Sequence, residues 1–225
     1  VLLPPKPEVH WTGDFTTAVP REMTAELAEL VGYFMGSGSL HAKGLRLTVS
    51  AADLDVAERL RILAKELFAL EAAVKERKRY TEISLDSVPL ALWWEACGFA
   101  KHSPSAKRSV QGYRPHIPDA ILHSNDAEVY AAFLRGLFEA DGTVRAGYPT
   151  WSTGDLEFSQ DVQTLLLALG FPTTRKLDRS GWVDSDLAVL RLLSVSSAAA
   201  WLDRVGFIGM RKSAAVRTGE GGYAS

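Results

Sequence analysis

Apolar residues recur at helical spacing near the start of the chain and then switch to the spacing of strands. Residues 22–36 carry an apolar face at positions i, i+3, i+4, i+7 and i+8, formed by Leu27, Leu30, Val31, Phe34 and Met35. Residues 45–50 then alternate apolar and polar side chains, which predicts a strand with one face against a core. Further patterns predict a helix at 53–69, a hairpin at about 72–85 and a helix at about 87–97.

The same order of patterns returns in the second half of the chain. A helix that ends at Asp141 is predicted to begin at a capping box of Asn125 and Glu128. A short hairpin, a helix at 155–169, a second hairpin and a last helix at 196–205 follow. Corresponding landmarks lie roughly 105 residues apart, which indicates an internal duplication. We therefore predict an α+β fold of tandem αββαββα repeats related by a pseudo-two-fold axis.

The duplication sets the expected domain organisation. The first repeat is assigned to residues 21–116 and the second to residues 117–215. Residues 1–20 contain several prolines and little periodicity, so they are expected to form an extended arm or the remnant of a linker. Residues 216–225 are expected to form a tail.

Each of the two central helices carries two small residues four positions apart, namely Gly32 and Gly36 in the first and Gly136 and Ala140 in the second. A glycine in a helix interior costs about 1 kcal/mol relative to alanine, so its presence requires a packing reason. Small residues at this spacing form a smooth strip that allows two helix backbones to approach closely. We predict that the two central helices pack against each other.

The ends of these helices combine small, polar and acidic residues. Glu139 and Asp141 lie in the last turn, where the helix dipole disfavours a carboxylate by about 0.3–1 kcal/mol unless a cation is near. Gly38 and Gly142 are expected to end the helices, because a residue just past a helix often has positive φ. Asp-Gly is also a common turn dipeptide. Two copies that both carry small-residue strips favour a functional site over a simple turn.

The segment Leu134–Gly142, LRGLFEADG, resembles the dodecapeptide motif of the LAGLIDADG homing endonucleases, and Leu30–Gly38, LVGYFMGSG, resembles its first copy. The resemblance extends over nearly all of residues 20–215, and the segment IPDAIL before the second motif is similar to endonuclease domains carried by inteins. It implies the LAGLIDADG endonuclease fold, with two antiparallel sheets that form a saddle for DNA. One departure is that Ser37 stands where the family has a metal-binding aspartate.

The resemblance implies cleavage of phosphodiester bonds with Mg²⁺ or another divalent cation as cofactor. Asp141 would be a direct metal ligand, and the main-chain carbonyls of Gly36 and Ala140 would also face the metals. Lys212 stands where the family has a basic residue that polarises water or steadies the scissile phosphate, although a lysine is favoured near a helix C-terminus in any case. The first half offers three basic candidates without a clear choice, Lys107, Arg108 and Arg114.

Ser37 changes the expected activity, since a neutral hydroxyl removes one charge from the metal site. We expect one metal to bind weakly or not at all. Double-strand cleavage is therefore predicted to be greatly reduced, with nicking of one strand or binding alone still open.

A two-fold body suits duplex DNA, and a β-ribbon fits the major groove. The predicted partner is double-stranded DNA with a long pseudo-palindromic or asymmetric site, bound by a monomer. A solvated strand face is the alternative for any single residue. Candidate contacts on the first sheet are Ser39, His41, Lys43, Arg46, Thr48, Lys75, Arg77 and Arg79, and on the second sheet Arg145, Tyr148, Thr150, Ser152, Arg175, Lys176, Arg179 and Trp182.

Composition modifies this interpretation only slightly. A formal net charge of -2 argues mildly against a nucleic-acid partner, but binding depends on where the charges lie. The single Cys97 excludes an internal disulfide and fits a reducing cytosol, so a cytoplasmic location is expected. No apolar run approaches the roughly 20 residues of a membrane span, so no membrane partner is expected.

Two other functions are open at this point. The first is a DNA-binding module without catalysis, as in bacterial regulators of the same fold; Ser37 supports it, and Asp141 with Lys212 opposes it. The second is a protein- or RNA-binding scaffold such as an intron maturase. Self-splicing is not expected, because the chain begins with Val1 and ends Tyr223-Ala224-Ser225, without the residues that inteins use to release themselves.

Overall fold

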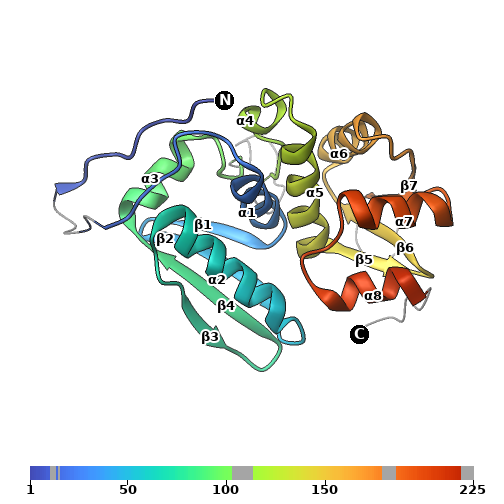
Figure 1. The fold of residues 1–225 in the computed structure, drawn as a ribbon, viewed down its shortest axis with the longest axis horizontal. Coiled ribbons are helices and arrows are strands. Elements are labelled where there is room, and N and C mark those ends of the chain that lie inside the picture. Colours follow the sequence, from blue (N-terminus) through green and yellow to red (C-terminus); the bar gives the residue numbers. More distant parts are fainter. Residues whose placement is uncertain (11–13, 15, 103–113, 179–185, 219–225) are drawn as a thin grey trace.

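The computed structural model describes residues 1–10, 14, 16–102, 114–178 and 186–218 (Figure 1). The first half contains α1 (Ala25–Ser37), β1 (Gly38–His41), β2 (Gly44–Ser50), α2 (Leu54–Phe68), β3 (Ala73–Glu76), β4 (Tyr80–Asp86) and α3 (Val88–Ala96). The second half repeats this order with α5 (Ala127–Asp141), β5 (Gly142–Arg145), β6 (Tyr148–Thr153), α6 (Leu156–Ala168), β7 (Thr173–Asp178), β8 (Leu187–Leu192) and α7 (Val195–Arg204). The predicted α+β fold with two αββαββα units is confirmed.

Two short helices were not predicted from the sequence. The single-turn helix α4 (Asp119–Leu122) precedes α5, and α8 (Met210–Thr218) follows α7. Helix α5 also begins differently from the prediction: Asp126 is the N-cap residue and accepts from the Glu128 amide, whereas Asn125 lies one residue earlier with φ 48°. The boundary between the halves near residue 116 stays a prediction.

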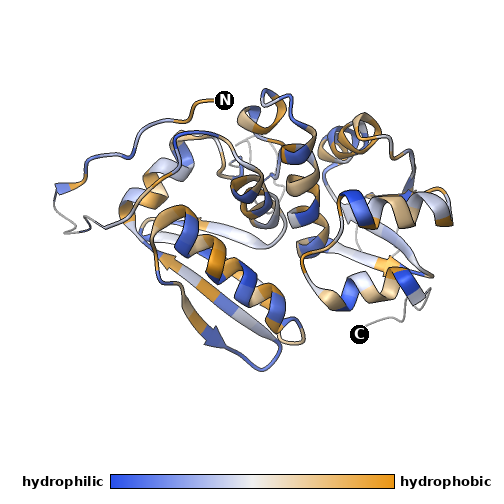
Figure 2. Cartoon of the chain, viewed as in Figure 1, coloured by the Kyte–Doolittle hydropathy of each residue, from blue (hydrophilic) through white to orange (hydrophobic). Residues whose placement is uncertain are grey.

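Each half contains one four-stranded antiparallel sheet. The strand order is β1-β2-β4-β3 in the first sheet and β5-β6-β8-β7 in the second, so the two sheets have the same topology. Figure 1 shows the sheets on either side of the pair formed by α1 and α5. Leu45, Leu47 and Val49 of β2 are buried as their alternation predicted. Figure 2 shows alternating hydrophobic and hydrophilic positions along α2 and a hydrophilic tip on the β3–β4 hairpin.

Helices α1 and α5 pack through the predicted small-residue strips. A Cβ atom added to Gly32 would lie 2.0 Å from the carbonyl oxygen of Phe133, and one added to Gly136 would lie 2.0 Å from the carbonyl oxygen of Glu29. Only a residue without a side chain fits where two backbones are this close. The prediction that the two central helices pack against each other is confirmed.

The expected positive φ at the glycines that end these helices is wrong. Gly38 has φ -113° and Gly142 has φ -81°, both in extended backbone that starts the next strand. The reason for glycine is steric, because a Cβ would lie 2.3 Å from the Phe34 ring at Gly38 and 2.4 Å from the Phe138 carbonyl oxygen at Gly142. Helix and strand therefore join without an intervening loop.

The helix pair also contains a buried carboxylate that the sequence did not reveal. Glu29 of α1 is 3% exposed, and its two oxygens accept from Arg59 of α2 at 2.8 Å and from Arg135 of α5 at 3.1 Å. Two cations compensate the burial of this charge. Among the described residues, no helix combines the length and apolar character that a membrane span needs.

Candidate functional site

The ends of α1 and α5 meet at the centre of the molecule. A Cβ added to Gly36 would lie 2.4 Å from Cβ of Ala140 and 3.2 Å from Oδ2 of Asp141. The Ser37 hydroxyl donates to the carbonyl oxygen of Ala140 at 3.3 Å. The structure thus brings together the three predicted metal ligands, Asp141, Gly36 and Ala140, with Ser37 beside them.

Two lysines lie at these helix ends. The ammonium group of Lys212 donates to the carbonyl oxygen of Glu139 at 2.5 Å and lies 3.7 Å from its carboxylate. The ammonium group of Lys101 donates to the carbonyl oxygen of Gly38 at 2.7 Å. Cations near C-terminal carbonyls are favoured by the helix dipole. These lysines explain how acidic residues are tolerated in the last turn of α5.

Lys101 was missed in the sequence. It comes three residues after the Gly-Phe pair at Gly98, and Lys212 comes after the corresponding pair at Gly206, so a lysine behind each pair was the available signal. The sequence instead suggested Lys107 for the first half, which lies outside the described residues. Arg114, another candidate for the first half, forms ion pairs with Asp155 and Glu157 of the second half.

Burial and the two lysines have opposite effects on the central carboxylate. Burial raises the pKa of Asp141 to about 6, and the charges of Lys101 and Lys212 oppose this rise. Burial lowers the pKa of each lysine, which the nearby carboxylates oppose. Asp141 nevertheless keeps an exposed surface at the helix end. It is therefore an anionic ligand that solvent or a bound molecule can reach.

The donor atoms at the helix ends fit one hard cation rather than two. Asp141 offers a carboxylate, and the main-chain carbonyls of Gly36 and Ala140 are oxygen donors of the kind that Mg²⁺ and Ca²⁺ prefer. Ser37 adds no charge, and its hydroxyl donates to the Ala140 carbonyl. Within the described part of the chain, no group of three or more His, Cys, Asp or Glu side chains forms a metal-binding cluster. A cation here would need further oxygen ligands from water or from a bound phosphate.

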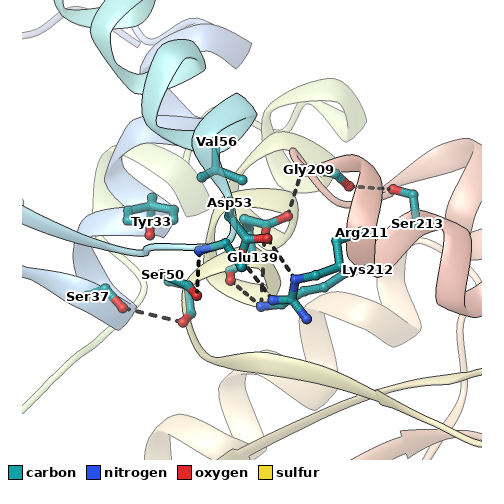
Figure 3. Close-up of polar contacts among 12 residues, drawn as sticks. Tyr33, Ser37, Ser50, Asp53, Val56, Glu139, Gly209, Arg211, Lys212 and Ser213 are labelled. Atoms are coloured by element: carbon teal, nitrogen blue, oxygen red, sulfur yellow. Dashed lines mark hydrogen bonds and ion pairs between the residues drawn. The ribbon is translucent and has the colours of Figure 1, made fainter. Parts of the chain in front are cut away.

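The segment that carries Lys212 is fixed to the first half. Arg211 forms a bidentate ion pair with Asp53 (Figure 3). Its Nε donates to Oδ1 at 2.7 Å, and its Nη2 donates to Oδ2 at 2.9 Å. The sequence predicted Asp53 as the cap of α2, and Asp53 holds that position, but its side chain makes no capping hydrogen bond. The carboxylate serves the contact between the two halves instead.

A second buried carboxylate supports the same segment. Glu139 is 4% exposed, and its Oε2 accepts from the main-chain amide of Gly209 at 2.9 Å. The amide of Met210, the first residue of α8, donates to Asp55 at 2.8 Å. Carboxylates at the start of a helix are favoured by its dipole. These contacts hold Lys212 over the end of α5.

We expect Arg211→Ala to lower the free energy of unfolding by about 2 kcal/mol, because it leaves the buried Asp53 carboxylate without its partner. The loss is smaller than for a fully buried ion pair, because the Arg211 side chain is half exposed to solvent. Urea denaturation followed by circular dichroism measures the change. Arg61→Ala is the matched control, since Arg61 pairs with Glu58 on the exposed surface of α2. Equal denaturation midpoints for Arg211→Ala and the wild-type protein would contradict a supporting role for the ion pair.

The first sheet presents a polar face opposite its core face. The register pairs Ser39 with Arg46 and Thr48 with Glu82, and Glu82 in turn with Lys75, so these side chains share one face. Of the other predicted contacts, Lys43 lies in the β1–β2 turn, Arg77 and Arg79 lie in the β3–β4 turn, and His41 lies in β1 next to the Ser39 hydroxyl. All eight candidates of this half therefore lie on the polar face or in its turns.

The second sheet has a corresponding polar face. The candidates on it are Arg145, Tyr148, Thr150, Ser152 and Lys176, of which Thr150 is only 2% exposed. Three further residues on this face were not predicted from the sequence: Thr143 and Arg191 lie opposite Thr150 on its two sides, and Thr174 lies opposite Arg191. The Arg191 guanidinium lies over the Tyr148 ring at 4.3 Å, so these two side chains support each other.

The placement predicted for Arg175 is wrong. Arg175 pairs with Leu190 in register, on the core side of the sheet, and its guanidinium donates to Ser159 of α6 at 2.9 Å. Strand β7 has too little alternation for its face to be assigned from the sequence. The candidates Arg179 and Trp182 lie outside the described residues.

Comparison with known proteins identifies the fold. Residues 128–206 match the family model described as a LAGLIDADG-like domain. The homing endonuclease I-DmoI in complex with DNA and Ca has a similar structure, with a TM-score of 0.59 and 17% identity, over 86% of this chain and 97% of that chain. The N-terminal LAGLIDADG domain of DUF199/WhiA gives a TM-score of 0.55 and 17% identity, over 84% of this chain and 86% of that chain.

Three curated relatives match a large part of this chain but a small part of their own length. The replicative DNA helicase DnaB of Nostoc sp. is 26% identical over 69% of this chain and 18% of the helicase. Two proteins of Methanocaldococcus jannaschii are each 27% identical to this chain. The replication factor C small subunit matches over 83% of this chain and 10% of its own length. The glutamine–fructose-6-phosphate aminotransferase matches over 72% of this chain and 14% of its own length. The chain thus spans less than a fifth of each of these relatives. It has the LAGLIDADG fold, and residues 128–206 of its second half match the model of a LAGLIDADG-like domain.

Proposed function

We propose that this chain binds a long duplex DNA site across its two sheets, and that it carries a phosphodiester-cleaving centre impaired by Ser37. The observation that carries the proposal is the position of Asp141, an exposed carboxylate beside Lys101 and Lys212, at helix ends that lie between the two sheets. The polar sheet faces carry arginine, lysine, threonine and serine side chains, which contact phosphates and base edges in DNA complexes. The likeness to I-DmoI complexes with DNA and Mn or Ca supports this assignment.

The residues at the helix ends have distinct roles in this proposal. Asp141, with the carbonyls of Gly36 and Ala140, would hold one divalent cation, Mg²⁺ or another. Such a cation supplies a nucleophilic water and stabilises charge on the leaving oxygen. Lys101 and Lys212 would contact the scissile phosphates, one from each half. Ser37 cannot supply the charge for a second cation, so we expect weak nicking at most from the protein with serine at this position.

We further propose that the chain derives from an endonuclease domain carried by an intein. The three curated relatives are a helicase, a replication factor and an aminotransferase, and the shared segment occupies only 10–18% of each. Because these proteins have such different activities, the segment that they share contributes to none of those activities. An inserted element explains the pattern and agrees with the segment IPDAIL before the second motif.

A non-catalytic DNA-binding protein is the second candidate. Ser37 and the similarity to the LAGLIDADG domain of DUF199/WhiA favour it. Retention of Asp141 and of two lysines at the helix ends opposes it, since DNA binding alone needs no such group. Both candidates share the DNA-binding surface, and they differ in whether a cation-dependent activity can be restored.

DNA binding is tested by selecting duplexes from a random library and measuring affinity for a selected duplex as salt increases. We expect log K to fall linearly with log salt concentration, with a slope of about -5 or steeper, because several phosphates are neutralised. Lys176→Gln on the polar face should make the slope about 0.9 less steep, whereas Lys65→Gln on α2 should leave it unchanged. Failure to enrich any duplex, or a slope near zero, would overturn the proposal.

A further inference from the structure

Two acidic side chains lie on the polar face of the first sheet, where a DNA-binding surface should be basic. β4 is an inner strand of this sheet, and Glu82 lies at its middle, opposite Thr48 of β2 and Lys75 of β3. Asp86 lies on the same face at the end of β4. The contacts predicted from the sequence on this sheet are basic or hydroxyl side chains, and neither acid is among them.

The two acids differ in how their charge is compensated. Asp86 accepts from the Arg46 guanidinium at 2.6 Å, so its charge is neutralised within the sheet. Glu82 forms no ion pair with any residue that the structure describes, although Lys75 is its cross-strand neighbour. A duplex bound to this face would therefore meet one uncompensated carboxylate among cations and hydroxyls.

The chemistry of base edges restricts what such a carboxylate can contact. An ionised carboxylate only accepts hydrogen bonds. In the major groove, guanine presents two acceptors, thymine an acceptor and a methyl group, and adenine a donor beside an acceptor. Cytosine alone presents the N4 amino donor without an adjacent acceptor. A carboxylate in this position is repelled by phosphates and by the acceptors of guanine and thymine. It meets both a donor and an acceptor on adenine, and it is stabilised most by cytosine.

We infer that Glu82 is a specificity-determining residue that accepts a hydrogen bond from the N4 amino group of a cytosine in the half-site bound by the first sheet. The inference rests on the proposed DNA-binding function. Glu82 lies on an inner strand between Thr48 and Lys75, so it is in the interior of the polar face rather than at the edge of that face. Neighbouring cations contribute the phosphate contacts, and Glu82 contributes selectivity.

Parallel selections from a random duplex library test this role, using the wild-type protein, Glu82→Gln and Glu76→Gln. Glu76 is the matched control, because it is opposite Thr81 in register, on the core side of the same sheet. The wild-type protein should enrich cytosine strongly at one position. An amide donates and accepts, which suits adenine, so Glu82→Gln should change the cytosine-to-adenine affinity ratio at that position by about tenfold or more. Glu76→Gln should keep the wild-type preference.

Other outcomes separate the inference from the proposed function. If Glu82→Gln enriches the same sequences as the wild-type protein and binds all of them more tightly, Glu82 is a solvated carboxylate and the inference is wrong, while DNA binding stands. If the wild-type protein enriches no duplex, the proposed function fails and the inference fails with it. Thermal denaturation of both variants shows whether the fold is retained; Glu82 is a partly exposed strand residue, so we expect unchanged midpoints.

Discussion

Ser37→Asp is expected to add a second divalent cation to the one that Asp141 would hold, and to enable this chain to cut duplex DNA. The new carboxylate would lie close to Asp141, since the ends of α1 and α5 are in contact at Gly36 and Ala140. Two carboxylates this close repel each other until a cation binds between them. Without metal, the variant should therefore be less stable than the wild-type protein.

Cation binding should reverse that loss. A cation at about 100 times its dissociation constant stabilises the folded state by about 2.7 kcal/mol, or about 5–10 °C in melting temperature for a domain of this size. Differential scanning fluorimetry with EDTA, Ca²⁺ or Mn²⁺ measures this without knowledge of the DNA site. Ser37→Asn is the matched control, because asparagine has a volume similar to that of aspartate and no charge, and its shift should not exceed that of the protein with serine.

On a selected duplex with Mg²⁺, Ser37→Asp should raise double-strand cleavage by at least about 100-fold over the protein with serine, which is the scale of a single stabilising group in an active site. The gain should require Asp141, so the double variant Ser37→Asp, Asp141→Asn should lose it. A cation-dependent melting shift without cleavage would retain the metal site and exclude the catalytic assignment. If Ser37→Asp shows neither a melting shift nor cleavage, both the metal site and the catalytic assignment are refuted.

Gly136→Ala is expected to disrupt the pair of central helices. The added methyl carbon would lie 2.0 Å from the carbonyl oxygen of Glu29 and 2.6 Å from the amide nitrogen of Tyr33. Both are backbone atoms of α1, so the clash cannot be relieved by rotating a side chain. The helices must separate, which should lower the free energy of unfolding by at least about 3 kcal/mol and the melting temperature by about 10 °C.

The sign of this effect is informative, because alanine is favoured over glycine in a helix by about 1 kcal/mol. If α1 and α5 did not touch at Gly136, the substitution would stabilise the protein. Gly32→Ala should behave like Gly136→Ala, since its methyl carbon would lie 2.0 Å from the Phe133 carbonyl oxygen. Gly154→Ala is the control: no atom lies within 4 Å of its Cβ position, so its melting temperature should be close to that of the wild-type protein.

The sequence predicted the order of elements, the duplication and the contact between the central helices because these features are recorded locally. Apolar periodicity marks each element, and Gly32 and Gly136 are unfavourable in a helix unless another backbone is close. The roles of Gly38 and Gly142 were misjudged, since a glycine after a helix fits both positive φ and a steric requirement. Only the path of the following strand separates the two.

The parts of the site that were missed depend on contacts between distant segments. Lys101 reaches the helix ends from a loop, and Arg211 reaches Asp53 from α8, whose position no local pattern reveals. Lys212 was named only through the family resemblance, and its contact with the end of α5 also depends on the position of α8. Asp53 was assigned as a cap because the same residue type serves caps and ion pairs. Arg175 was placed on the wrong face because a shift of one residue along a strand exchanges its two faces, and the polar stretch of β7 does not fix that register.

Hydroxyl-radical footprinting of a selected duplex tests most directly that DNA lies across both sheets with the helix ends at its centre. We predict two protected stretches on either side of a central segment, one for each sheet. Arg46→Gln should weaken protection on one side, and Lys176→Gln on the other. Protection of a single side, or equal weakening of both sides by either variant, would contradict this arrangement.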